Sequence, residues 1–312
     1  MQRFSFAVLA SALSTLLVCS AAQAGVWNST DLFTSNSMGS NQVSHYAANG
    51  AFIDSFNVGG TGGDVRGMAF DQNGWMYAVR SVGSGLGVTA IDSNGVVHGQ
   101  YSAASYVMGN ISYGSIAIAN DGKFYVASQD SLIAFTPGVA QGTAIYTNNQ
   151  VFDVKALANG NLMVLSAYAL DEISPSGALV HHITTPRLVD ARGLEYDAVS
   201  NDIFVTMLGY TGHSFELMRI DGSSGALEAS TSFWYGNDLL LTADHRLLVG
   251  SRTQAPGYFN TNLQAGGSLG TRDQLFVSQY VQAVSVPEPG SVALLLAGVA
   301  ALAWARRRQA RS

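Results

Sequence analysis

An internal repeat is the feature that most constrains the fold of this 312-residue chain. Each copy is a polar turn rich in Asn, Asp and Gly, followed at once by a short apolar strand. The copies lie at 71–79, 120–127, 159–165, 200–206 and 243–249. Successive copies are roughly 38 to 48 residues apart, which is the repeat length of β-propeller blades. The repeat therefore predicts an all-β fold of the propeller type.

A second repeat lies out of phase with the first and consists of a strand, a tight turn and another strand. Its copies lie at 43–56, 88–97, 132–138, 170–177 and 217–225. The Asn-Gly and Asp-Gly pairs in these turns tolerate the positive φ angles that tight hairpins require. Two alternating hairpins in each repeat predict a blade of four strands.

The repeats predict six blades. The segment 31–56 provides only three strands, and the C-terminal segment 274–281 is expected to supply the missing innermost strand and close the ring. Closure would also protect strand edges that are otherwise exposed. Five or seven blades and a non-closed β-structure are the alternatives. In pattern, the repeats resemble the NHL and regucalcin-like six-bladed propellers.

The N-terminus has the features of a secretory signal peptide. Arg3 provides the positive charge, residues 4–18 are apolar, and Ala22-Gln23-Ala24 supplies small residues for cleavage after Ala24. We therefore predict a signal helix at 1–24 that signal peptidase removes, which leaves the propeller domain at 25–285.

The C-terminal segment 286–312 combines a Pro287-Glu288-Pro289 motif, an apolar run at 292–305 and the arginines 306–308. This tail resembles the PEP-CTERM sorting signal, in which exosortase, a membrane-embedded protease, cleaves near the motif and releases the protein to the cell exterior. Roughly 15 apolar residues form a helix of about 22 Å, shorter than the roughly 30 Å hydrocarbon core of a bilayer. The tail therefore predicts transient anchoring in the inner membrane through a transmembrane helix, with the arginines in the cytoplasm. The alternative is a membrane anchor that is never processed.

The charge balance excludes some classes of partner. Five of the 15 Lys and Arg residues lie in the two terminal segments, but only one of the 21 Asp and Glu residues does. The middle of the chain therefore carries ten basic against twenty acidic residues. Such an acidic protein does not bind nucleic acid or anionic lipid by bulk electrostatics.

Charged residues recur just before or within the predicted innermost strands, where a propeller opens its central channel. Asp64-Val65-Arg66-Gly67 and Asp190-Ala191-Arg192-Gly193 are near copies of each other. The candidate binding residues are Asp64, Arg66, Asp153, Lys155, Asp190, Arg192 and Asp238. Together they could bind sugar hydroxyls or a charged peptide. The alternative interpretation is that each Asp–Arg pair ties neighbouring blades together or caps a turn.

A catalytic role would depend on a single residue. Glu195, within a predicted inner strand, is the one candidate catalytic residue, because a carboxylate among apolar neighbours can carry a raised pKa. The regucalcin-like resemblance implies a lactonase with a divalent metal in the channel, and Ca²⁺ would suit oxygen ligands. No residue spacing requires a metal or another cofactor, and none is predicted.

Together these features predict a cell-surface or extracellular-matrix protein that binds rather than catalyses. Exopolysaccharide is the expected ligand because the sorting system that the tail resembles accompanies exopolysaccharide production. Aromatic residues near predicted strand ends, including Tyr106, Tyr113 and Trp234, could stack on sugar rings, although most aromatics fill space between blades. The alternatives are a metal-dependent lactonase-type hydrolase and a purely structural component of the biofilm matrix.

Overall fold

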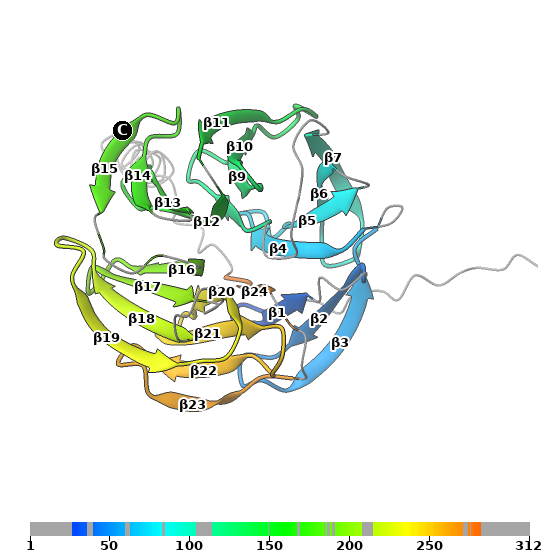
Figure 1. Ribbon diagram of the computed structural model, residues 1–312. Coiled ribbons are helices and arrows are strands. Elements are labelled where there is room, and N and C mark those ends of the chain that lie inside the picture. The colour runs from blue at the N-terminus through cyan, green and yellow to red at the C-terminus, as the bar shows by residue number, and fades with distance from the viewer. Residues whose placement is uncertain are drawn as a thin grey trace, which may run out of the picture.

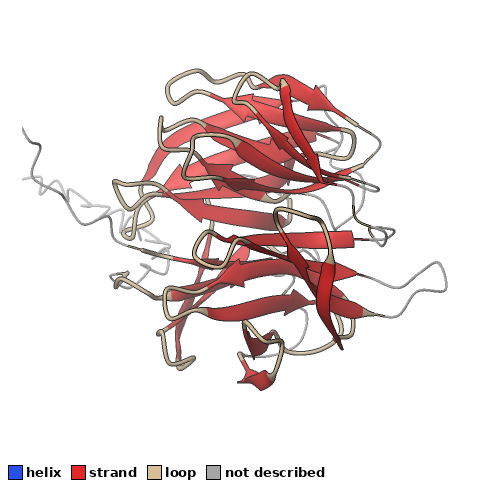
Figure 2. Ribbon diagram, turned by 90° about the vertical axis from the view of Figure 1, so that its left-hand side faces the viewer, coloured by secondary structure: helices blue, strands red, loops and turns tan. Residues whose placement is uncertain are grey.

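The computed structural model describes residues 27–35, 40–59, 63–82, 85–103, 114–148, 150–166, 169–183, 185, 188, 191–207, 215–270, 274 and 276–281. Within these ranges every regular element is a β-strand, as Figure 2 shows. The predicted signal helix at 1–24 and the predicted helix of the 286–312 tail lie outside the described residues. No helix in the described part of the chain is long and apolar enough to cross a membrane.

The described strands form six antiparallel sheets of four strands each, arranged around a central axis as the blades of a propeller (Figure 1). From the axis outward, blade 1 consists of β24 (Phe276–Gln279), β1 (Leu32–Ser35), β2 (Gln42–Tyr46) and β3 (Phe52–Asn57). Blade 2 consists of β4 (Val65–Phe70), β5 (Met76–Val82), β6 (Gly85–Ile91) and β7 (Val97–Ala103). Blade 3 consists of β8 (Ile116–Ile118), β9 (Phe124–Ala127), β10 (Ser131–Phe135) and β11 (Thr143–Thr147).

The second half of the ring repeats the same order. Blade 4 consists of β12 (Val151–Ala156), β13 (Leu162–Ser166), β14 (Leu170–Ile173) and β15 (Leu179–Ile183). Blade 5 consists of β16 (Ala191–Asp197), β17 (Asp202–Met207), β18 (Glu216–Asp221) and β19 (Leu227–Ser232). Blade 6 consists of β20 (Gly236–Leu241), β21 (Arg246–Ser251), β22 (Gly257–Asn260) and β23 (Ala265–Ser268).

The ring closes as the sequence predicts. The C-terminal strand β24 pairs with β1, with Leu32 opposite Gln279 and Ser35 opposite Phe276, so the innermost strand of blade 1 comes from the other end of the chain. The prediction of six four-stranded blades closed by the C-terminal strand is confirmed. The limits of the domain at 25 and 285 stay predictions.

The repeated polar turns end the inner strands through local hydrogen bonds. In blade 2, Oδ1 of Asp71 accepts bonds from the backbone amides of Asn73 and Trp75, both at 2.9 Å. Gly74 completes this turn with a φ of 79°, a conformation that residues with a Cβ rarely adopt. The turn therefore reverses the chain between β4 and β5 with its own polar groups satisfied.

The hydrophobic core is divided among the spaces between neighbouring blades. Blades 4 and 5, for example, are joined by a cluster that contains Phe152, Leu194 and Val205. Inner and second strands are covered on both faces by adjacent blades, which explains why β17 is buried along its whole length, whereas the outermost strand β23 is exposed along its whole length. This packing fixes the inner strands and the side chains that they carry toward the axis.

Candidate functional site

Three blades carry a carboxylate or hydroxyl at equivalent positions in, or directly before, the inner strand. The register places Asp153 opposite Leu165 in blade 4 and Asp238 opposite Gly250 in blade 6, in each case directly after a β-bulge. In blade 3, Ser115 precedes β8 at the corresponding point and donates a hydrogen bond to Oδ1 of Asp153. A bulge re-aims the side chains next to it, so these groups turn toward neighbouring blades.

Asp153 joins three blades. Its Oδ1 accepts from the amide of Val154 at 2.7 Å and from the hydroxyl of Ser115, while Oδ2 accepts from the amide of Leu194 in blade 5 at 2.7 Å. The residue is only 1% exposed. Both carboxylate oxygens are therefore occupied by groups of the protein.

Asp238 repeats this arrangement two blades further on. Oδ1 accepts from the amide of Leu239, and Oδ2 accepts from the amide of Val277 in β24, both at 2.9 Å. Asp238 thereby links blade 6 to blade 1 across the point where the ring closes.

Glu195 makes the third link, between blades 5 and 6. Its Oε1 accepts from the amide of Tyr196 and its Oε2 from the amide of Leu241, both at 3.0 Å. Nζ of Lys155 lies 3.4 Å from Oε2 of Glu195 and donates to the carbonyl of Leu239 at 3.1 Å. Lys155 thus reaches from blade 4 past blade 5 to blade 6, which places it near the axis.

Asp153, Lys155, Glu195 and Asp238 together form an axial cluster. Burial and mutual charge perturb the protonation of three of its members, Asp153, Lys155 and Asp238. Burial, reinforced by the charge of Asp153, raises the pKa of Asp238 to about 7, although Lys155 and the two amide donors oppose the shift. Burial also raises the pKa of Asp153 against the opposing charge of Lys155. Burial alone would lower the pKa of Lys155, but the attraction of the three carboxylates outweighs it and the pKa is raised. Lys155 therefore stays protonated and compensates part of the negative charge.

The other predicted binding residues are Asp64, Arg66, Arg192 and Asp190. Arg192 places its guanidinium 3.9 Å from the ring centroid of Phe152 in blade 4 and donates to the carbonyl of Ala191 at 2.7 Å. Arg66 is buried, and burial lowers its pKa while the charge of Asp64 opposes this shift. Asp190 lies outside the described residues. The structure thus groups Asp153, Lys155 and Asp238 with Glu195.

The roles of these residues in binding or catalysis stay predictions. What the structure adds is that all three carboxylates of the axial cluster accept backbone amides from two blades. The described residues contain no group of three or more His, Cys, Asp or Glu side chains arranged to hold a metal ion. The metal-dependent alternative stays a prediction.

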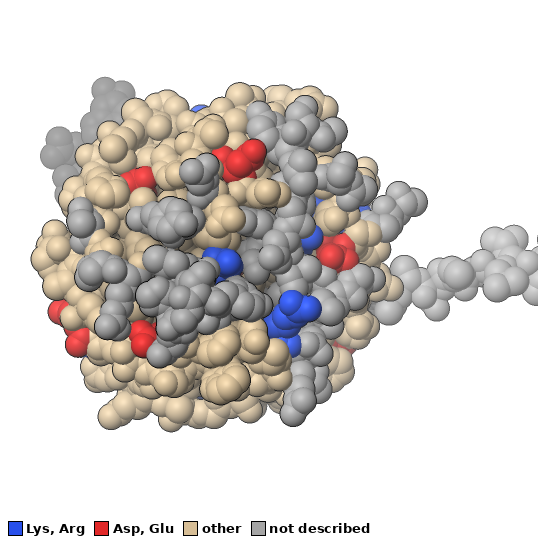
Figure 3. All heavy atoms as spheres, in the orientation of Figure 1, with Lys and Arg blue, Asp and Glu red and all other residues tan. Residues whose placement is uncertain are grey.

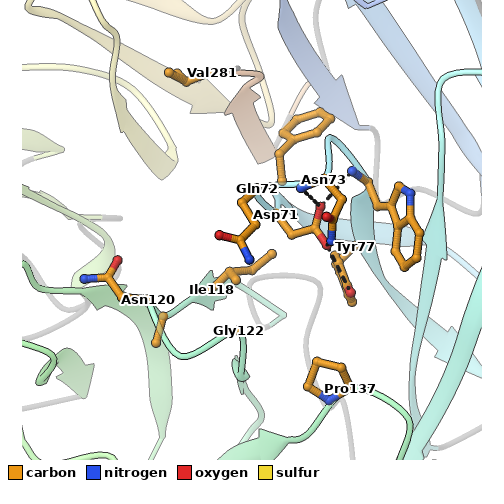
Figure 4. Close-up of a pocket in the computed structure, with 12 residues that line it drawn as sticks. Asp71, Gln72, Asn73, Tyr77, Ile118, Asn120, Gly122, Pro137 and Val281 are labelled. Atoms are coloured by element: carbon orange, nitrogen blue, oxygen red, sulfur yellow. Dashed lines mark hydrogen bonds between the residues drawn. The ribbon is translucent and has the colours of Figure 1, made fainter. Parts of the chain in front are cut away.

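A separate groove of about 420 Å³ opens between blades 2 and 3, at the end of the propeller where the inner strands finish. This volume lies within the range of small-molecule sites, about 300–1,000 Å³. The groove is lined by Phe70, Asp71, Gln72, Asn73, Trp75, Tyr77, Ile118, Ala119, Asn120, Gly122, Pro137 and Val281. Figure 4 shows Gln72 lying between Asp71 and Asn120, with Pro137 and Val281 at opposite ends of the lining.

Two carboxamides in this groove are available to a ligand. Among the described residues, the side chains of Gln72 and Asn120 make no hydrogen bond to the protein, unlike Asp71, whose oxygens hold its own turn. Trp75 forms part of the wall and is fixed by parallel stacking on His98, with ring centroids 4.0 Å apart. The groove therefore combines free donors and acceptors with a rigid aromatic ring.

The sequence analysis did not identify this groove. Gln72 and Asn120 belong to two successive copies of the polar turn, which were interpreted only as turns. Gln72 and Asn120 occupy the same position in neighbouring repeats, and adjacent blades bring corresponding turns side by side around the ring. This equivalence was the feature of the sequence that could have indicated the groove.

Comparisons with known proteins identify the C-terminal motif and support the fold. Residues 285–309 match the family model of the PEP-CTERM protein-sorting motif. No curated protein matches the chain significantly in sequence. A chain from a nidogen/laminin complex is similar in structure with a TM-score of 0.61 at 10% identity, over 82% of this chain and 100% of that chain.

Two bacterial structures are also similar. A protein of unknown function from Bacteroides caccae has a TM-score of 0.56 at 11% identity, over 80% of this chain and 98% of that chain. The virginiamycin B lyase of Staphylococcus aureus has a TM-score of 0.54 at 12% identity, over 79% of this chain and 83% of that chain. At such identities these likenesses concern the fold alone. The chain is thus a six-bladed β-propeller followed by a PEP-CTERM sorting motif, which implies export and C-terminal processing by exosortase toward the cell surface.

Proposed function

We propose that this protein is a non-enzymatic binding module of the cell surface or extracellular matrix, and that it binds a polysaccharide in the groove between blades 2 and 3. The observation that carries the proposal is that Gln72 and Asn120, two carboxamides with no hydrogen-bond partner among the described residues, line the same groove as the fixed ring of Trp75. A carboxamide both donates and accepts hydrogen bonds, as sugar hydroxyls also do. The flat apolar face of an aromatic ring suits the C–H face of a pyranose.

The charge of the groove favours a neutral sugar over an acidic one. Among the described residues that line it, Asp71 is the one charged residue, and none is a Lys or Arg that could bind a uronate or a sulfate. On the face of the molecule in Figure 3, charged side chains are sparse among the described residues and uncharged surface predominates. A polyanionic chain would also be repelled by the acidic middle of the protein.

The location of the protein agrees with this ligand. The sorting motif implies export, so the groove would meet the polysaccharides outside the cell. In this scheme signal peptidase removes residues 1–24, and the tail anchors the chain transiently in the inner membrane until exosortase acts. Exopolysaccharide of the producing cell is then the ligand that the protein encounters first.

The proposal is tested by binding of the exported protein to deproteinised exopolysaccharide from the host culture, immobilised on a sensor surface. Replacing both carboxamides (Gln72→Ala with Asn120→Ala) should weaken binding about tenfold, since each neutral hydrogen bond contributes about 0.5–1.5 kcal/mol and 1.4 kcal/mol is a factor of ten. Gln100→Ala, on the exposed strand β7 outside the groove, is the matched control and should bind normally. Absence of binding by the unmodified protein, or equal binding by the groove variant, would overturn the proposal.

A further inference from the structure

Trp234 is a large aromatic residue that is exposed to solvent. Its side chain is 59% exposed, in the connection between β19 and β20 where blade 5 leads into blade 6. Its ring stacks on that of Phe215, with centroids 5.0 Å apart and an interplanar angle of 14°. A parallel neighbour covers only one face of a ring, so the other face of the indole is available to a ligand.

The backbone around Trp234 also departs from the conformation that its residues prefer. Tyr235, the next residue, has a φ of 55°, which is unfavourable for a bulky aromatic residue. Its ring packs at 4.6 Å against Phe215, and the hydroxyl of Ser251 donates to the carbonyl of Trp234 at 2.9 Å. Strained backbone that is held in place by its surroundings is concentrated at functional sites. The strained residue here directly follows the exposed Trp234.

An uncharged groove of about 330 Å³ lies beside this ring. Its polar lining comes from Thr231, Ser232, Gln254 and Ser268, and Tyr258 and Phe259 contribute aromatic surface. No Asp, Glu, Lys, Arg or His is among the described residues that line it. Hydroxyls and a carboxamide beside an exposed ring suit a neutral, hydroxyl-rich ligand, as in the groove between blades 2 and 3.

The two grooves point in opposite directions. The boundary of blades 2 and 3 and that of blades 5 and 6 are three blades apart, on opposite sides of the ring (Figure 1). The Asp71 turn follows inner strand β4, whereas Trp234 precedes inner strand β20, so the grooves also open at opposite ends of the propeller. An inner strand of six residues alone separates those ends by about 20 Å. A short oligosaccharide therefore does not fill both grooves of one molecule.

We propose that the groove at Trp234 is a second polysaccharide-binding site, and that each protein molecule bridges two polysaccharide chains. This inference rests on the proposed function, because it assigns the same class of ligand to the second groove. It makes the protein a cross-linker of the extracellular matrix rather than a simple coat on one chain.

The test is a bridging assay with the exported protein. Deproteinised host exopolysaccharide on beads captures the protein, and fluorescently labelled soluble exopolysaccharide is then added. The unmodified protein should retain the label. Trp234→Ala and the double variant of Gln72 and Asn120 should each still bind the beads but lose most of the label, and a variant with all three changes should bind the beads at least about tenfold more weakly. Phe52→Ala removes another aromatic residue that is 60% exposed, in blade 1, and should bridge normally.

The outcomes separate this inference from the proposed function. Failure of the unmodified protein to bind the beads would refute the proposed function. Normal bead binding together with undiminished bridging by Trp234→Ala would refute the second site alone, as would loss of bridging by Phe52→Ala to the same extent. Bridging must be measured on protein that light scattering shows to be monomeric, because a dimer with one site in each subunit would also bridge. Capture of a protein rather than the labelled polysaccharide by the Trp234 groove would also overturn the assignment.

Discussion

The carboxylate of Asp238 accepts a hydrogen bond of 2.9 Å from the backbone amide of Val277, 39 residues along the chain. This bond crosses from β20 to β24, the strand that closes the ring. Asp153 and Glu195 make links of the same kind. Each carboxylate accepts one hydrogen bond from the backbone amide of the next residue and one from a backbone amide of the following blade.

Removing the Asp238 link should weaken the closure of the propeller. At pH 5, Asp238→Ala should lower the free energy of unfolding by about 1–3 kcal/mol, because the buried amide of Val277 loses its partner. Asp238→Asn keeps one oxygen acceptor and should lose less. Urea denaturation followed by tryptophan fluorescence measures both, and an alanine variant as stable as the unmodified protein would contradict the role of the link.

Asp238 should also make stability depend on pH. Its pKa is about 7 in the folded protein against an ordinary value of 3.8, so between these values the folded state binds more protons than the unfolded state. The stabilisation from this group is therefore complete below about pH 4 and is lost as the pH rises through 7, with a slope of at most about 1.4 kcal/mol per pH unit. Urea midpoints measured at intervals from pH 4 to 8 should show that the stability of Asp238→Asn increases relative to that of the unmodified protein as the pH rises. A constant difference between the two proteins would exclude this titration.

Lys155 should be essential to the axial cluster. Lys155→Met should destabilise the protein by roughly 3–5 kcal/mol at pH 8, because two buried carboxylates and the partly buried Glu195 lose their common positive partner. Adding Glu195→Gln removes one of these charges while retaining an amide acceptor, and should recover part of the loss in a double-mutant cycle. Lys123→Met is the control, since Lys123 and Asp121 are both more than 40% exposed and such pairs contribute at most about 1 kcal/mol. Equal effects at the two lysines would be inconsistent with a special role for Lys155.

Gly67 should not tolerate a side chain. A Cβ at this position would lie 2.2 Å from the carbonyl oxygen of Gly114 in the neighbouring blade, where backbone meets backbone. Gly67→Ala should therefore lower the melting temperature strongly, with a loss of more than about 3 kcal/mol. Gly266→Ala is the matched control, because its Cβ would have no contact closer than 3.7 Å. A mild effect at Gly67 would mean that blades 2 and 3 can move apart at little cost.

The sorting motif should determine the mature C-terminus. Replacing Pro287, Glu288 and Pro289 with alanine should leave the 286–312 tail attached and keep the protein in the membrane fraction, because exosortase would lose the rigid element that it reads. Intact-mass spectrometry of the culture supernatant and the membrane fraction measures this directly, and also reports whether the chain begins at Gly25. Pro175→Ala, in a turn of the propeller, is the control. Unchanged release of the triple variant would show that processing does not depend on the motif.

The fold could be predicted from the sequence to a greater extent than the contacts at the axial cluster. The turn at 71–74 could be predicted because its bonds join residues that are at most four positions apart. The bond between Asp153 and Leu194 spans 41 residues and depends on which amide blade 5 offers, which no local pattern records. Asp64-Val65-Arg66 and Asp190-Ala191-Arg192 are near copies in sequence, yet Arg66 is buried while Arg192 is partly exposed and stacks on Phe152. Copies of a motif diverge because each meets a different neighbouring blade.

By itself, the sequence determined the repeat, the four-stranded blade, the closure by the C-terminal strand and the sorting motif. These features depend on alternation and turn chemistry within a few residues, and on a short linear signal. Only the tertiary structure decided which side chains meet across the ring, so that Asp153, Glu195 and Asp238 accept backbone amides while Gln72 and Asn120 remain open to solvent. The physical reason is that ring closure brings together residues about one blade apart, and the fate of a polar group depends on whether the neighbouring blade supplies its partner.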